Sequence, residues 1–197
     1  FTELFDDNLL LQFHKYWNNP DRESLAPYLA ARERLNVPIF MGEGGENNTD
    51  WYAGAFRLFD ELGISWNFWT WKKLDTTNSP ASVPLPSGWE TITAYAEGGP
   101  RPAPARARET LAEFLENIQL GRCGYHGDVV NAVLRRPPLR IPAIFYSFAG
   151  RGLGFELAGG GAATGNAVDG AHTGDVPMAP VTGFRTGDGT RFGYVSP

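Results

Sequence analysis

Three short apolar runs, each followed by a segment with helical periodicity, occupy the first half of this chain. The runs cover residues 9–16, 37–42 and 64–72, and the helical segments cover residues 22–35, 50–62 and 89–96. Strand–helix alternation with a period of about 30 residues predicts right-handed βαβ units in a parallel sheet that helices cover. The sequence therefore predicts an α/β fold.

Polar and aromatic side chains occur near the carboxyl end of each apolar run. They are Gln12, His14, Glu43, Asn67 and Trp69. We expect each strand to direct an apolar face toward the helices and this mixed face away from them. That pattern favours a (β/α)8 barrel over a doubly wound sheet, but a complete barrel takes about 250 residues. Residues 1–99 are therefore predicted to form the last three βα units of an incomplete (β/α)8 TIM barrel.

The composition changes after residue 99. Residues 100–121 contain a proline-rich linker, residues 100–104, and an amphipathic helix, residues 105–120. Beyond them, short apolar runs alternate with glycine-rich turns, which is typical of a small all-β sandwich. These runs cover residues 129–134, 141–148, 154–157 and 192–195. We expect residues 122–197 to be a second, β-rich domain.

Charge and cysteine content exclude several classes of function. The net charge is −5 over 197 residues, which argues against nucleic-acid binding. A single cysteine, Cys123, excludes an intramolecular disulfide framework and a cysteine-based zinc site.

No run approaches the roughly 20 apolar residues of a membrane span. Residues 1–5 have neither an initiator Met nor a basic segment, so we expect the chain to begin within a longer protein. We expect a monomer with no metal or cofactor.

His14, Glu43 and Trp69 provide one candidate side chain per predicted strand, at spacings of 29 and 26 residues. If they share the mixed face, they place an imidazole, a carboxylate and an indole together at the carboxyl ends of the strands. Enzymes that cleave sugars need a carboxylate at the anomeric carbon and polar and aromatic groups around the sugar. Each residue taken alone also fits a structural role, as a buried histidine, an acid in a glycine turn or a core tryptophan.

Three stretches of these strands form an ordered set of motifs: Phe13-His14-Lys15-Tyr16, Pro38-Ile39-Phe40-Met41-Gly42-Glu43 and Trp66-Asn67-Phe68-Trp69-Thr70-Trp71-Lys72. They resemble the last three strands of glycoside hydrolase family 5, the cellulase family, over residues 1–99. The resemblance implies an extracellular retaining β-glycosidase, similar to a cellulase-like endoglucanase. Its partner would be a β-glycan polysaccharide or oligosaccharide, hydrolysed by double displacement.

The resemblance also implies roles for individual residues. Glu43 matches the nucleophile, and His14 and Tyr16 match the pair that hydrogen-bonds the sugar and the nucleophile. Trp69 matches the sugar platform, and Lys72 matches a basic residue that lines the outer subsites. Asn47, which follows the nucleophile in the glycine loop, is expected to line the cleft and contact substrate.

Two departures from the family pattern concern the active site. Gly44 stands where the family usually has an aromatic residue, and the chain contains no Asn-Glu-Pro, the motif that carries the family's acid/base glutamate. Retaining hydrolysis needs two carboxyl groups about 5 Å apart. Glu46 and Asp75 are the local candidates for the second one, although we expect Glu46 to line the cleft or face water. We expect the acid/base to lie upstream of residue 1 and the isolated chain to be inactive on glycans.

The carboxyl-terminal part resembles the beginning of a family 6-type carbohydrate-binding module. The matching stretches are Ile141-Pro142-Ala143, Gly150-Arg151-Gly152 and Phe184-Arg185-Thr186-Gly187-Asp188-Gly189. Such modules often carry an acidic calcium ligand directly after Ile-Pro-Ala, but Ile144 occupies that position here. We predict no metal site.

A non-catalytic carbohydrate-binding protein is the alternative interpretation, built from a barrel remnant and a sugar-binding module. Aromatic side chains are sufficient for such a protein, whereas an acid beside His14 and Tyr16 favours catalysis. The missing second carboxylate favours the alternative.

Overall fold

The computed structural model describes residues 5, 6 and 8–141. The described residues divide into two compact units, one formed by those up to residue 69 with residues 128–141 and the other by residues 70–127. We call these the first and the second unit. The first boundary follows residue 69, whereas the sequence suggested one after residue 99. The expectations for residues 142–197, including most of the β-rich domain and the module-like motifs, lie outside the described residues.

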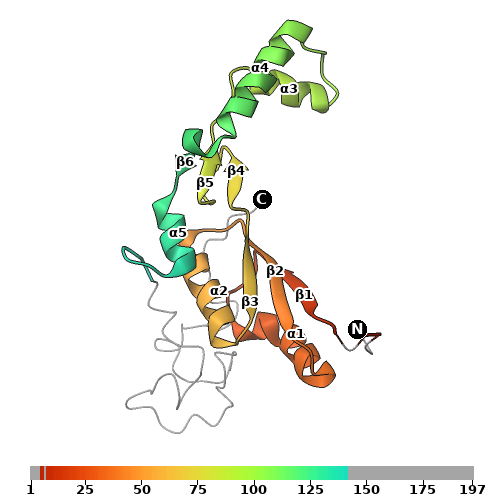
Figure 1. Cartoon of the computed structure of the whole chain (residues 1–197), viewed down its shortest axis with the longest axis vertical. Coiled ribbons are helices and arrows are strands. Elements are labelled where there is room, and N and C mark those ends of the chain that lie inside the picture. The colour runs from red at the N-terminus through yellow and green to blue at the C-terminus, as the bar shows by residue number, and fades with distance from the viewer. Residues whose placement is uncertain (1–4, 7, 142–197) are drawn as a thin grey trace, which may run out of the picture. The chain divides into compact units, whose positions relative to one another are not determined.

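The first unit contains a three-stranded parallel sheet with the strand order β1-β2-β3 (Figure 1). Strand β1 covers Leu11–Lys15, β2 covers Ile39–Gly45 and β3 covers Ser65–Trp69. Helices α1 (Arg22–Leu35) and α2 (Thr49–Glu61) connect them. The α/β class and the first two strand–helix alternations are as predicted.

Local signals place the ends of both helices. Asp21 is the N-cap of α1, and its carboxylate accepts a hydrogen bond from the Ser24 backbone N–H at 2.9 Å. Helix α2 begins one residue earlier than predicted, because Asn48 is its N-cap and accepts from the Trp51 N–H at 2.9 Å. Gly63 follows α2 with φ +63°, the left-handed conformation that ends many helices.

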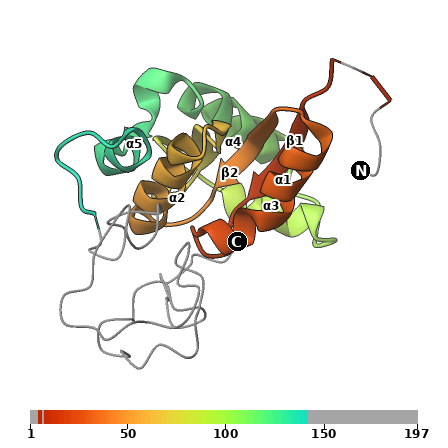
Figure 2. The same cartoon turned by 90° about the horizontal axis from the view of Figure 1, so that it is seen from below.

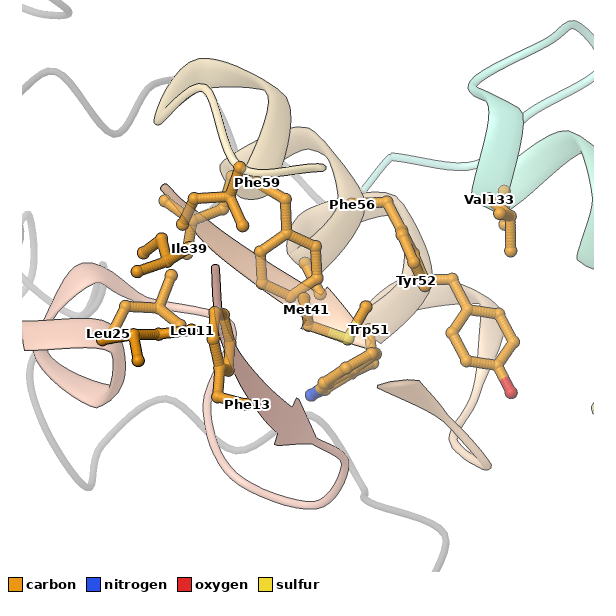
Figure 3. Packing of buried hydrophobic residues seen from close by; sticks show 14 of the residues in the cluster. Leu11, Phe13, Leu25, Ile39, Met41, Trp51, Tyr52, Phe56, Phe59 and Val133 are labelled. Atoms are coloured by element: carbon orange, nitrogen blue, oxygen red, sulfur yellow. The ribbon is translucent and has the colours of Figure 1, made fainter. Parts of the chain in front are cut away.

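The two helices cover the same face of the sheet. Figure 2 shows α1 and α2 beside strands β1 and β2. Along β1, Leu11 and Phe13 are buried while Gln12 and His14 are exposed. The buried strand residues join helix residues in one core cluster, whose centre is shown in Figure 3: Leu11, Phe13, Leu25, Ile39, Met41, Trp51, Tyr52, Phe56 and Phe59. The opposite face of β1 is free to present polar side chains.

The prediction of a strand at residues 129–134 is wrong. Helix α5 covers Gly127–Leu134, and its Val129, Ala132 and Val133 are buried in the core of the first unit. The spacing of these three residues is i, i+3, i+4, which belongs to a helix face. The β-branched valines led to the strand prediction, although the burial pattern is helical.

The third predicted strand, residues 64–72, is also longer than the observed one. Strand β3 ends at Trp69, and β4 (Lys72–Leu74) belongs to a second sheet, in the second unit. That sheet has the order β4-β5-β6, with β5 at Ala81–Val83 and β6 at Gly124–Tyr125. Trp69 and Trp71 lie on either side of the break, so the aromatic residues of this stretch did not reveal it.

Two helices of the second unit match their predicted positions closely. Helix α3 covers Trp89–Ala96, and α4 covers Pro104–Asn117, followed by a short 3₁₀ turn, η1, at Leu120–Arg122. The rings of Trp89 and Phe114 stack between α3 and α4 with centroids 5.1 Å apart. Among the described residues, no helix is both long and apolar enough to cross a membrane.

Candidate active site

An irregularity in the sheet determines which way Glu43 faces. Phe13 is paired with Met41, but the next residue of β1, His14, is paired with Glu43. Strand β2 therefore has one extra residue, Gly42, which is a β-bulge. Met41 lies before the bulge and is buried against the helices. Beyond it the alternation is reversed, so Glu43 lies on the face of His14, away from the helices.

Glycines after the bulge allow the strands to approach closely. The strand was predicted to end at Gly42, but β2 continues to Gly45. Gly45 has φ +154°, and a Cβ there would lie 1.9 Å from the Trp69 carbonyl oxygen. At Gly44 a Cβ would lie 2.8 Å from the Lys15 carbonyl oxygen. Because both obstacles are backbone atoms, only glycine fits at these two positions.

One carboxylate oxygen of Glu43 has two polar neighbours. The Tyr16 hydroxyl donates to Glu43 Oε2 at 2.5 Å, and His14 Nδ1 lies 3.4 Å from the same oxygen. Oε1 has no hydrogen bond within the described part of the chain, and the side chain is 34% exposed. The carboxylate is thus oriented through one oxygen, and the other can react with a ligand.

Gln12 selects the tautomer of His14. Its amide Nε2 lies 2.9 Å from His14 Nε2. An amide NH₂ can only donate, so the ring nitrogen that it faces accepts. In the neutral imidazole the proton is then on Nδ1, the nitrogen beside Glu43. With this tautomer the ring N–H is on the nitrogen that lies 3.4 Å from Glu43 Oε2.

Tyr16 remains protonated at neutral pH. Burial raises the pKa of its hydroxyl, and the hydrogen bond to Glu43 and the charges of Glu43 and Glu46 raise it further. Each of these causes penalises a phenolate. Tyr16 is therefore a lasting hydrogen-bond donor to Glu43 and not a proton-transfer group.

Asn47 positions Tyr16, and its side chain is not free to bind a ligand. The residue is fully buried. Its Nδ2 donates to the Tyr16 carbonyl oxygen at 3.0 Å, and its Oδ1 accepts from the Asn48 N–H at 2.9 Å. The sequence placed Asn47 in contact with substrate, but both ends of its amide are occupied by backbone groups. It links the segment after β1 to the start of α2.

Lys15 fixes the same segment from inside the protein, a role that the sequence did not reveal. It is 3% exposed. Its ammonium donates to Asn18 Oδ1 at 2.7 Å, to the Asn19 carbonyl oxygen at 2.7 Å and to Ser24 Oγ at 2.6 Å. Burial lowers the pKa of Lys15 from 10.5 to about 7, and the nearby charge of Asp21 opposes this change.

We expect the free energy of unfolding to rise with pH between about pH 7 and about pH 9. In this range the unfolded chain keeps Lys15 protonated, whereas the folded chain releases the proton near pH 7. The unfolded state therefore binds more protons, and folding is favoured as they are lost. Urea denaturation across this range measures the effect. The slope should disappear in Lys15→Met and persist in the control Lys72→Met, and an unchanged slope in Lys15→Met would contradict this assignment.

Two exposed tryptophans lie at the ends of the strands near the carboxylate. Trp69 is 44% exposed, and its backbone is paired with Gly45, two residues after Glu43. Trp17 is 42% exposed, and its ring stacks on Tyr16 with centroids 5.1 Å apart. Sequence reasoning missed Trp17, and its position directly after Tyr16 was the available signal.

The other predicted residues are less directly connected to this group. Burial raises the pKa of the Tyr16 and Tyr52 hydroxyls, and the charge of Glu46 adds to the rise at both. Lys72 and Asp75 belong to the second unit, where the Lys72 ammonium donates to the Ile118 carbonyl oxygen at 2.7 Å. The structure thus brings together His14, Tyr16 and Glu43. Within the described ranges, no group of three His, Cys, Asp or Glu residues could hold a metal ion.

Comparison with known proteins gives no relative: no family model, curated protein or solved structure matches this chain.

Proposed function

We propose that this chain supplies the nucleophile side of a retaining β-glycosidase site, with Glu43 as the nucleophile and an extracellular β-glycan as the substrate. The observation that carries the proposal is the asymmetric environment of the carboxylate. Oε2 accepts the hydrogen bond of Tyr16 and lies 3.4 Å from His14 Nδ1, while Oε1 has no hydrogen-bond partner among the described residues. This arrangement suits attack by Oε1 on an anomeric carbon.

The reaction would follow double displacement. A bond forms between Glu43 Oε1 and the anomeric carbon while the bond from that carbon to the leaving oxygen breaks. The leaving oxygen takes a proton from a second carboxyl group, and water later hydrolyses the glycosyl ester. The sequence has no Asn-Glu-Pro to supply that acid. We therefore propose that natural glycans, whose leaving groups need protonation, require a carboxyl group from outside this chain.

The finer fold assignment, the last three units of a (β/α)8 barrel, belongs to the same proposal. It is supported by the parallel sheet and by the burial of α1 and α2 against one face of that sheet. A doubly wound sheet carries helices on both faces. In a barrel the other face lines the interior, and its residues at the carboxyl ends of strands carry the chemistry.

An activated substrate tests the nucleophile without the missing acid. The phenolate of 2,4-dinitrophenyl β-cellobioside leaves without being protonated, so glycosylation needs only the nucleophile. We expect the chain to release dinitrophenolate in a burst of about one equivalent. A chain that binds cellobiose but releases no dinitrophenolate would overturn the proposal.

A carbohydrate-binding protein without catalysis is the second candidate. The exposure of Trp17 and Trp69 favours it, because sugar binding needs aromatic surfaces but no reactive acid. Binding of cello-oligosaccharides with no burst would support this second function.

We expect Trp69→Ala to weaken oligosaccharide binding about tenfold, as the loss of one aromatic platform does. Trp66→Ala is the matched control on the other face of β3. The Trp66 ring packs 4.5 Å from Phe56, and its Nε1 donates to Asp60 Oδ1 at 2.9 Å. Its loss should lower the free energy of unfolding by about 3 kcal/mol and leave the affinity of the folded protein unchanged. Calorimetric titration and urea denaturation together separate the two effects, and equal losses of affinity at unchanged stability would contradict the assignment of faces.

A further inference from the structure

The small sheet of the second unit has an open position on one face. Ser82, in the central strand β5, is paired with Lys73 of β4 on one side and with Gly124 of β6 on the other. Paired residues direct their side chains to the same face, and Gly124 has none. A Cβ at Gly124 would lie 3.9 Å from Ser82 Cβ, so the missing side chain leaves space directly beside the serine.

This space is part of a pocket of about 270 Å³. Its wall includes Asp75, Thr77, Ser82, Pro84 and His126. All of these residues belong to the second unit, so the pocket depends on that unit alone. A volume below the range of drug-sized pockets suits a ligand of about one ring.

The polar groups of the pocket have spare hydrogen-bonding capacity. Ser82 Oγ accepts from the Thr76 backbone N–H at 3.0 Å, which leaves its hydroxyl hydrogen to donate. The Asp75 carboxylate and the Thr77 hydroxyl make no hydrogen bond or ion pair within the described residues. The pocket therefore offers carboxylate acceptors beside hydroxyl groups that both donate and accept.

His126 adds a stronger indication of a ligand. Its imidazole Nε2 is buried and has no hydrogen-bond partner among the described residues. An unsatisfied buried polar atom costs about 1–3 kcal/mol, and proteins normally satisfy it with protein or water. A ligand hydroxyl or a water molecule that reached Nε2 would supply the missing hydrogen bond.

The chemistry of the wall selects among ligand classes. Lys73 is on the same face of the sheet as Ser82 but is not part of the pocket wall, and the Asp75 carboxylate repels anions. A carboxylate can accept from two neighbouring hydroxyls, Ser82 and Thr77 can exchange hydrogen bonds with others, and Pro84 offers an apolar surface to C–H groups. This combination suits a neutral ring that carries adjacent hydroxyl groups.

We propose that the pocket between β5, β6 and the segment after β4 is a binding site for one neutral saccharide ring. This site shares no residue with the group around Glu43. Its existence does not depend on the glycosidase proposal.

Two histidines report on the two sites in one titration. We use the 197-residue chain with Glu43→Gln, so that no reaction occurs, and add glucose, xylose, mannose or cellobiose up to about 50 mM. The imidazole NMR resonances of His126 and His14 are followed separately. At least one neutral sugar should shift the His126 resonances with a millimolar Kd, whatever happens at His14. A response at His14 alone would overturn this proposal and leave the glycosidase proposal intact.

Substitutions in the wall give the controls. Asp75→Asn should weaken the His126 response at least about tenfold, because an amide accepts fewer hydroxyls than a carboxylate. Gly124→Val should abolish it by filling the space beside Ser82. Gly121→Ala is the matched control, since an added Cβ meets nothing within 4 Å there. Unchanged binding in Gly124→Val, or a response to propylammonium or phosphate instead of sugars, would overturn the proposal.

Discussion

Glu43→Gln is expected to abolish dinitrophenolate release from the activated cellobioside and to leave cellobiose binding within about threefold. The amide keeps the shape of the carboxylate and can still accept the hydrogen bond from Tyr16. It lacks the negative charge and cannot form the glycosyl ester, so covalent catalysis is lost and not merely slowed. Stopped-flow absorbance measures the burst, and calorimetric titration measures the binding.

Chemical rescue distinguishes Glu43 from Glu46. In Glu43→Gly, azide can occupy the vacated space and attack the anomeric carbon, which should restore cleavage and give a glycosyl azide of inverted configuration. Rescue by azide in Glu46→Gly, or wild-type burst kinetics in Glu43→Gln, would mean that a different carboxylate is the nucleophile.

Phe56→Ala should lower the free energy of unfolding by about 3–5 kcal/mol, as truncation of a large core residue does. Phe56 is fully buried, and its ring lies 4.5 Å from that of Trp66 and 5.7 Å from that of Phe59. A loss of this size is a large part of the total stability of a typical domain. Urea denaturation measures it.

Leu111→Ala is the control for this core substitution. Leu111 lies in α4 and is largely exposed, so its truncation should change the free energy of unfolding by less than about 0.5 kcal/mol. Equal effects of Phe56→Ala and Leu111→Ala would contradict the position of the core.

The helices could be predicted because their signals are local. Asp21 and Gly63 mark helix ends by capping chemistry that three or four residues determine. Residues 129–134 illustrate the limit of such reasoning. Their β-branched side chains favour a strand, but burial against the core of the first unit selects the helix.

The orientation of Glu43 could not be predicted from alternation. Ile39, Met41 and Glu43 are each two residues apart, so a regular strand would direct all three toward the helices. The bulge at Gly42 reverses the last of them. The spacing predicts Glu43 and His14 as one residue per strand on a shared face, but regular alternation does not put them there and only the bulge does. A bulge depends on pairing with neighbouring strands, which a single strand does not encode.

The structural roles of Lys15 and Asn47 could not be predicted from the sequence either. Asn47 binds the Tyr16 carbonyl oxygen, which is distant in the sequence, and the Lys15 ammonium binds the turn after β1 and Ser24 of α1. Their residue types suggest solvent or ligand contacts, and only the tertiary fold shows that they hold the segment that carries Tyr16.

Covalent trapping tests the assignment of Glu43 most directly. The chain is incubated with 2,4-dinitrophenyl 2-deoxy-2-fluoro-β-cellobioside, digested, and mapped by mass spectrometry. Attack by Glu43 Oε1 forms the ester and expels dinitrophenolate, and the fluorine slows hydrolysis of that ester. We predict one fluorocellobiosyl group per chain, attached to Glu43 and absent in Glu43→Gln. A chain that binds cellobiose but acquires no label, or that carries the label on Glu46 or any other residue, would contradict the account.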